Sequence, residues 1–154
     1  MSHQANIEVD NVKTSEEAHL IAGLRAVFGE DGVEVHETPA NLNLWNGQAA
    51  KGVNNWGEFS PCHIIVRRAA MEKALGHHAA TNDLGYRRNK DGTYTLFSDK
   101  AGFPQALQER VWEETNISKA TAKVKAQGYK VSRAVGLDGR TVLTATKKDL
   151  KAKV

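Results

Sequence analysis

The chain has 154 residues, of which 40% are hydrophobic and 25% are charged, a composition that suits one globular domain and argues against a second. No apolar run approaches the roughly 20 residues of a membrane-spanning helix, and the opening MSHQANIEVD lacks the basic start and apolar stretch of a signal peptide. The single cysteine, Cys62, cannot form an internal disulfide, so we expect a soluble, cytoplasmic protein without membrane contact.

The charge is distributed unevenly along the chain. Residues 1–60 carry 3 Lys and Arg against 9 Asp and Glu, whereas residues 61–154 carry 18 against 9, so a net charge of −6 precedes one of +9. A basic second half is typical of a surface that binds phosphates. The two halves can also fold together and partly neutralise each other, and the sequence leaves both interpretations open.

The first predicted helix follows residue 13. Thr14 and Glu17 have the spacing of a capping box, which predicts that the helix starts there. Gly29 can adopt the left-handed conformation that ends a helix. Between them, apolar residues recur at helical spacing and predict a face packed on the core: Leu20, Ile21, Leu24, Val27 and Phe28.

A short strand is predicted at VEVHE, residues 33–37, and residues 38–61 then follow no simple periodicity and are rich in Asn and Gly. We interpret residues 38–61 as a long loop, which is uncommon inside a compact domain and often functional. Its aromatic residues Trp45, Trp56 and Phe59 can stack on a ligand or fold back as a hydrophobic patch.

CHIIVRR, residues 62–68, predicts a strand that is covered on both faces and lies centrally in a sheet. The segment AAMEKALGHHAATN after it predicts a brief helical turn or an exposed loop. Residues 84–98 predict a hairpin, because Asp91 and Gly92 are residue types that tolerate positive φ between two alternating runs.

A helical pattern follows from Pro104 to Gly128, as one long helix or as two joined near Asn116. Residues 129–146 predict a second hairpin, which turns at Asp138-Gly139. The predicted order is strand, helix, strand, long loop, strand, hairpin, helix, hairpin.

Strands joined by tight turns pair antiparallel, so we expect an α+β fold, with an antiparallel β-sheet built largely of hairpins and two main helices packed on one face. Residues 1–154 then form a single α+β domain with a long Asn, Gly and Trp loop at about residues 38–61.

Four motifs in this order resemble a known family. They are the opening MSH, DLGYRRNKDGTYTLFSD at residues 83–99, AKVKAQGYKV at residues 122–131 and DGRTVLTATK at residues 138–147. Through them the chain resembles the family of unknown function numbered 1257, whose plastid members are called hypothetical chloroplast open reading frame 35. The likeness is best from about residue 62 onward. The chain departs from the family pattern in its long loop, in its expanded GHHAATN connection and in VWEETNISK, which replaces a Tyr-rich stretch.

The resemblance implies where such proteins occur and which partner is a candidate. Members of the family occur in plastids, cyanobacteria, other bacteria and large phages, often encoded near an AAA-type ATPase. It therefore implies the cytoplasm of a bacterium, a plastid or a phage-infected host, and an AAA-type ATPase as a candidate partner. It supplies no catalytic residues.

Patterns for catalysis and metal binding are incomplete. Cys62 and His63 suggest a thiol and a base, but adjacent residues of a strand point to opposite faces. Together with His77 and His78 they lack the paired spacing of a zinc site, so we expect no metal and no cofactor. Neither GxxxxGK[ST] nor GxGxxG occurs. An enzyme with a dispersed site is therefore the least favoured class.

Arginines in or beside predicted strands are the strongest functional signal; they are Arg67, Arg68, Arg87, Arg88, Arg133 and Arg140. The planar guanidinium binds phosphate or carboxylate with two hydrogen bonds. We predict a ligand-binding site at Arg67, Arg87 or Arg88, Tyr86, Trp45 and Trp56. Because Arg87 and Arg88 face oppositely, at most one of them belongs to a site on one face.

The leading functional hypothesis is a non-catalytic binding protein for a phosphate-bearing ligand, either a small nucleotide or nucleic acid. A phage-type protein that sequesters a nucleotide signal is one concrete version. The alternative is an adaptor that docks on a protein partner such as an AAA-type ATPase through the acidic first half or the Trp loop. Salt separates the two, since phosphate contacts weaken steeply as salt rises.

Overall fold

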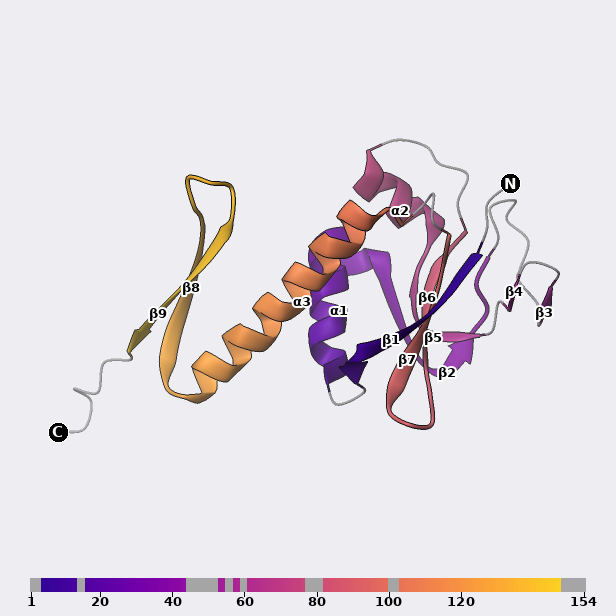
Figure 1. Ribbon diagram of the computed structural model, residues 1–154, viewed down its shortest axis with the longest axis horizontal. Helices are drawn as coiled ribbons and strands as arrows, with labels where there is room; N and C mark the ends of the chain where they lie inside the picture. The colour runs from indigo at the N-terminus through magenta and orange to yellow at the C-terminus, as the bar shows by residue number, and fades with distance from the viewer. Residues whose placement is uncertain are drawn as a thin grey trace.

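The computed structural model describes residues 16–43, 61–76, 82–98 and 103–147 with their side chains, and residues 4–13, 53–54, 57–58 and 99 as backbone. The elements are, in chain order, β1 (Gln4–Lys13), α1 (Glu17–Phe28), the 3-10 turn η2 (Glu30–Gly32), β2 (Val33–Ala40), β3 (Val53–Asn54), β4 (Gly57–Glu58), β5 (Cys62–Val66), α2 (Arg68–Leu75), β6 (Leu84–Arg88), β7 (Thr93–Asp99), α3 (Gln105–Ala126), β8 (Tyr129–Val135) and β9 (Thr141–Lys147) (Figure 1). The predicted α+β class is confirmed.

The central element is a five-stranded antiparallel sheet with the strand order β1-β7-β6-β5-β2. β5 is an interior strand, as its apolar run predicts. The helices α1 and α3 lie on one side of this sheet, with α1 nearer to it (Figure 1). The main core forms in that layer from the sheet residues Ile64, Val66, Leu84, Tyr86, Tyr94 and Leu96 and the helix residues Leu20, Leu24, Phe28, Met71, Leu107 and Val111.

The other face of the sheet carries a second, smaller cluster. Leu42, Cys62, Ile65 and Phe97 are all fully buried there. Gly85 allows this packing, because a Cβ at that position would lie 2.6 Å from the Cys62 sulfur and 2.7 Å from Leu42. The chain after β2 therefore contributes at least Leu42 to the cover of this face.

In some local details the structure differs from the sequence predictions, and in others it decides between the alternatives that the sequence left open. β2 continues to Ala40, three residues beyond the predicted strand, and β3 and β4 pair with each other inside the segment predicted as a loop. The segment after β5 forms a two-turn helix, α2, that ends at Gly76 in the left-handed region. α3 is a single helix, without a break near Asn116.

The predicted capping box can be compared with the structure only at Glu17, since Thr14 lies outside the described residues. α1 begins at Glu17, with Glu16 at its N-cap and without a side-chain capping bond. The Glu17 carboxylate instead accepts hydrogen bonds from Arg88 and Tyr94. The Glu17 carboxylate, which the predicted capping box would use locally, is therefore engaged in tertiary hydrogen bonds.

Both predicted hairpins form. β6 and β7 are joined by a turn in which Gly92 has a φ of 86°, and β8 and β9 by a turn in which Gly139 has a φ of 81°. The second hairpin is a separate two-stranded sheet that stands beside α3, away from the five-stranded sheet (Figure 1). We call β8, β9 and the turn between them the ribbon.

The two main helices approach closely at one point. A Cβ on Gly23 of α1 would lie 2.2 Å from the Thr115 hydroxyl oxygen and 2.8 Å from the Thr115 backbone nitrogen on α3. The Thr115 hydroxyl donates to the Val111 carbonyl within its own helix, so it is held in place at the contact. The absence of a side chain at position 23 thus sets the spacing of α1 and α3.

Candidate functional site

Arg67, the first predicted site residue, is bound by carboxylates of the same chain. It follows β5, and its guanidinium donates to both oxygens of Glu34 at 2.7 and 3.0 Å and to Asp83 at 2.9 Å. It also donates to the Asn41 carbonyl at 3.1 Å. These contacts raise the pKa of Arg67, chiefly through the hydrogen bonds to Glu34, and that pairing in turn lowers the pKa of Glu34. The hydrogen bonds of Arg67 therefore link the end of β5 to Glu34 on β2 and to Asp83, the residue before β6.

Asp83 is the buried member of this cluster, with a side chain only 3% exposed. Besides Arg67 it accepts backbone N–H groups from Asn43 and Arg68, each at 2.8 Å. Its two oxygens therefore tie the start of α2 to the segment after β2. A phosphate at Arg67 would have to displace carboxylates that are already held, so the described geometry gives this arginine a structural role.

Arg88 lies on the opposite side of the sheet, next to the start of α1. It donates to Glu17, 71 residues away, at 2.5 and 2.9 Å, and the Tyr94 hydroxyl donates to the same carboxylate. Burial acts to raise the pKa of Glu17, but the bonds from Arg88 and Tyr94 outweigh it, and the pKa lies below its usual value. The Arg88 backbone N–H donates to Nδ1 of His63 at 3.0 Å.

Arg87 and Tyr86 differ sharply in exposure. Arg87 is half-buried, and its guanidinium carbon lies 5.0 Å from the centre of the Phe97 ring, on the face away from Arg88 as the sequence predicts. Tyr86 is buried in the main core, with its ring edge-on to Tyr94. Tyr86 therefore cannot stack on a ligand at the surface, and that part of the predicted site is wrong. Trp45 and Trp56 lie outside the described residues.

The unequal charge of the two halves is partly explained by ion pairs between them. Glu34 pairs with Arg67, Glu17 with Arg88, and Glu16 with Lys119 at 3.1 Å. In each pair the acid comes from the first 60 residues and the base from the remainder. Mutual neutralisation thus accounts for Arg67 and Arg88, two of the arginines in the site predicted from the sequence.

A basic surface remains at the junction of α3 and the ribbon. Residues 117–147 contain seven Lys and Arg against one acid, Asp138. Lys119 and Arg133 pair with carboxylates, and Arg140 lies 3.7 Å from Asp138. Four lysines of this segment are exposed and have no carboxylate partner among the residues that the structure describes; they are Lys123, Lys125, Lys130 and Lys147.

The fold brings these four lysines to one region. Lys123 and Lys125 lie in the last turn of α3, and Lys130 is the second residue of β8, four residues after the helix ends at Ala126. Tyr129 pairs with Lys147, so the end of β9 returns to the same place. We call Lys123, Lys125, Lys130 and Lys147 the basic corner. The sequence signal for the basic corner was the net charge of +9 on residues 61–154. The sequence prediction placed the binding site at arginines of the sheet instead of at these lysines.

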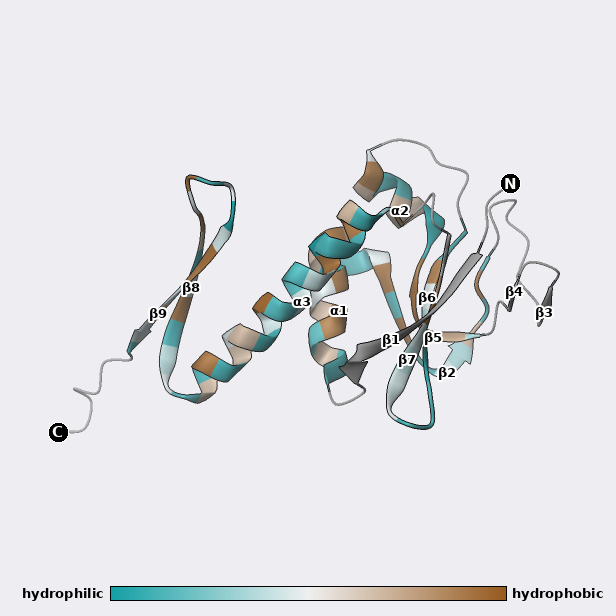
Figure 2. Cartoon of the chain, viewed as in Figure 1, coloured by the Kyte–Doolittle hydropathy of each residue, from teal (hydrophilic) through white to brown (hydrophobic). Residues whose placement is uncertain are grey.

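The tip of the ribbon is apolar and open to solvent. Val135 is 72% exposed, Leu137 is fully exposed and Val142 is 47% exposed. Figure 2 shows hydrophobic segments near this tip. Arg140 and Asp138 flank them with exposed side chains. An isolated two-stranded ribbon buries little apolar surface by itself, so such residues at its tip suit contact with another molecule.

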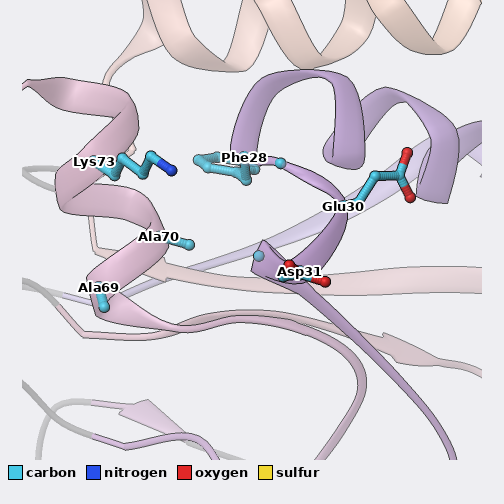
Figure 3. Close-up of a pocket in the computed structure, with 8 residues that line it drawn as sticks. Phe28, Glu30, Asp31, Ala69, Ala70 and Lys73 are labelled. Carbon is cyan, nitrogen blue, oxygen red and sulfur yellow. The ribbon is translucent and has the colours of Figure 1, made fainter.

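A hollow of about 340 Å³ lies between the end of α1 and α2 (Figure 3). Its lining combines Phe28, Gly29, Gly32, Ala69 and Ala70 with the charged residues Glu30, Asp31 and Lys73. Lys73 points across the hollow toward Phe28, and Asp31 lies at its edge (Figure 3). We refer to this site as the hollow.

Cys62 and His63 have different surroundings and do not form a thiol and base pair. Cys62 is buried in the small cluster, and burial raises the pKa of its thiol to about 12. His63 is near Arg88 instead, and both burial and Arg88 lower its pKa. Across the described part of the chain, no three His, Cys, Asp or Glu side chains are placed to hold a metal ion. In the same residues, no helix has the length and apolar character needed to cross a membrane.

Comparison with known proteins finds no match to this chain among protein-family models, curated proteins or solved structures. The comparisons therefore assign no family, and the resemblance to the family numbered 1257 depends on the quoted motifs alone.

Proposed function

We propose that the protein is a non-catalytic nucleic-acid-binding protein that contacts the phosphate backbone with its basic corner. The observation that carries the proposal is the gathering of Lys123, Lys125, Lys130 and Lys147, all exposed and without a described carboxylate partner. Lysine ammonium groups bind phosphate oxygens as point charges, and each releases condensed counterions from the nucleic acid. The ligand is still phosphate-bearing, as expected from the sequence, but the proposed site is the basic corner and not the arginines of the sheet.

The shape of this region also supports a polymer rather than a single nucleotide. The lysines lie on the outside of a helix end and an adjoining ribbon. Lys130 and Lys147 are on opposite faces of the ribbon, because Lys147 pairs with Tyr129, so a long backbone that passes around the ribbon can contact both. Arg67 and Arg88, which would suit a small phosphate, are held by Glu34, Asp83 and Glu17. A two-stranded ribbon is also an element that fits a nucleic-acid groove.

A structural interpretation of two of the lysines has to be weighed. Cations in the last turn of a helix are stabilised by the helix dipole, which accounts for Lys123 and Lys125 without any ligand. It does not account for Lys130 and Lys147, which lie on the ribbon. These two residues are therefore the most informative positions to change.

The test is binding of labelled single-stranded and double-stranded oligonucleotides, followed by fluorescence anisotropy across a salt series. We expect affinity to fall steeply with salt, and Lys130→Gln or Lys147→Gln to reduce the slope of log affinity against log salt by roughly 0.9 each on a duplex. Lys90→Gln is the matched control, because Lys90 is exposed at the β6–β7 turn and far from the corner. The proposal fails if the variant with all four lysines changed binds as tightly as the parent.

The second candidate function is docking on a protein partner, which the exposed apolar tip favours. An apolar contact keeps its strength as salt rises, whereas phosphate contacts weaken. The same salt series, applied to a partner captured from the host, separates the two functions.

A further inference from the structure

The two faces of the ribbon differ in what they contact. Residues that pair across two antiparallel strands point to the same side, so the register of β8 and β9 sorts the ribbon into two faces. Arg133 pairs with Leu143 and also binds Glu114, so their face is the one turned toward α3. We call the opposite face the outer face; its residues are Lys130, Ser132, Ala134, Val142, Thr144 and Thr146.

The outer face is exposed and combines hydroxyl groups with small apolar groups. The hydroxyls of Ser132, Thr144 and Thr146 have no hydrogen-bond partner among the residues that the structure describes. Each hydroxyl donates one hydrogen bond and accepts others, so it suits donors and acceptors alike. The acid of the ribbon, Asp138, lies in the turn and accepts the Arg140 backbone N–H. The outer face therefore carries no negative charge.

The dimensions of the ribbon match the major groove of B-form DNA. That groove is about 12 Å wide and admits a two-stranded ribbon, whose strands lie about 4.8 Å apart. Each strand has seven residues, and roughly 3.3 Å per residue gives a length close to that of about six base pairs at 3.4 Å each. Base edges in this groove present donors, acceptors and the thymine methyl group, to which Ser and Thr hydroxyls and small apolar side chains are suited.

The charge around the outer face matches the two phosphate backbones that border the groove. Lys130 belongs to the outer face, and Lys147 lies at the same end on the other face. Arg140 is exposed at the opposite end, in the turn. Positive groups thus stand at both ends of the ribbon, where a groove-bound ribbon meets the backbones.

We propose that the ribbon binds in the major groove of double-stranded DNA, with its outer face against the base edges. Ser132 and Thr144 hydrogen-bond to bases, and the basic corner contacts the phosphates. The inference rests on the nucleic-acid binding proposed above and adds the form of the nucleic acid, the groove and the residues that select a sequence. Double-stranded RNA is not the ligand, because its major groove is too deep and narrow for side chains to read.

A structural interpretation of the threonines has to be weighed. Threonine is common in strands because its branched side chain suits a sheet, which accounts for its presence without any ligand. Valine has the same shape and strand preference but no hydroxyl. The change Thr144→Val therefore removes the proposed base contact and keeps the strand.

The first experiment selects tight binders from a pool of random DNA duplexes. We expect enrichment of a motif of about four to six base pairs, and weaker binding of RNA duplexes and single strands of the same sequence. Dimethyl sulfate then locates the groove, because it methylates guanine N7 in the major groove and adenine N3 in the minor groove. Bound protein should protect N7 within the motif and leave N3 reactive.

The second experiment compares the selected duplex with a scrambled one. The double variant Ser132→Ala, Thr144→Val should lose preference for the selected duplex by about fivefold or more, with an unchanged salt slope because the lysines remain. Thr141→Val is the matched control. Thr141 lies on the same strand but on the face turned toward α3, since it pairs with Val135, so this variant should keep the preference.

Four results would overturn the inference. Duplex DNA could bind with a steep salt dependence but without an enriched motif or an effect of the double variant, which leaves the proposed function intact. Protection of adenine N3 would place the protein in the minor groove. Tighter binding of single strands or RNA would exclude a ribbon in the DNA major groove. Absence of binding to every nucleic acid would overturn the proposed function as well.

Discussion

Both terminal guanidinium nitrogens of Arg133 on β8 donate hydrogen bonds to the carboxylate of Glu114 on α3, and this ion pair holds the ribbon against the helix. The pairing raises the pKa of Arg133, chiefly through the hydrogen bond to Glu114. Because most residues of the ribbon are exposed, few apolar contacts share this task. This pair of side chains therefore contributes to the orientation of the basic corner and of the tip.

Changing Glu114 should loosen the ribbon without unfolding the sheet. We expect Glu114→Gln to speed hydrogen exchange of the β8 and β9 amides several-fold while exchange in β5, β6 and β7 stays the same. Glu113→Gln is the matched control, because Glu113 is the exposed neighbour on the same helix. Equal exchange in the two variants would show that the ion pair does not hold the ribbon.

Arg67→Ala should destabilise the protein, in contrast to the expectation for a surface ligand site. It leaves Asp83 buried without its guanidinium partner and breaks two bonds to Glu34. We expect a loss of about 2–3 kcal/mol in the free energy of unfolding, less than for a fully buried pair because Arg67 is about one third exposed. Urea denaturation measures this loss. A change below about 0.5 kcal/mol would contradict the structural role.

Gly23→Ala should separate α1 from α3. Alanine normally stabilises a helix relative to glycine by up to about 1 kcal/mol, but here its Cβ would lie 2.2 Å from the Thr115 hydroxyl and 2.8 Å from a backbone nitrogen. We expect a net destabilisation of about 1–3 kcal/mol. Thermal unfolding measures it, and an increase in the melting temperature would show that the helices do not meet there.

Stability should decline as the pH falls from about 7 toward 5, because of His63. Its folded-state pKa lies below the ordinary value of 6.5, through burial and Arg88. The unfolded chain therefore takes up this proton first, and the folded state loses stability as the pH falls through 6.5. Protonation also removes the Nδ1 acceptor of the Arg88 N–H. His63→Gln should flatten the dependence of the unfolding free energy on pH in this window.

The Cys62 thiol should resist alkylation in the folded protein. Burial raises its pKa to about 12, so at pH 8 the reactive thiolate is scarce as well as enclosed. Iodoacetamide should label Cys62 only in molecules that have opened or unfolded, and Gly85→Ala, which crowds its sulfur, should speed the labelling. Rapid labelling of the folded parent would contradict the burial of this side chain.

Local chemistry in the sequence determined the class of the fold and its turns. The Asp-Gly pairs at 91–92 and 138–139 predict two hairpins because glycine alone adopts positive φ without strain, and both form. The helical spacing of apolar residues predicts α1 and α3 as the layer that covers one face of the sheet. The opposite directions of Arg87 and Arg88 also follow from the period of a strand.

Only the tertiary structure decided which charged residues remain open to a ligand. Glu17, Glu34 and Asp83 are distant in sequence from Arg88 and Arg67, so no local pattern shows that they neutralise them. The alternation of strand residues likewise cannot tell whether Tyr86 faces solvent or a helix layer. The basic corner forms because β9 returns beside the end of α3, and pairing across a turn fixes that neighbourhood, whereas composition gives only the sum of the charges.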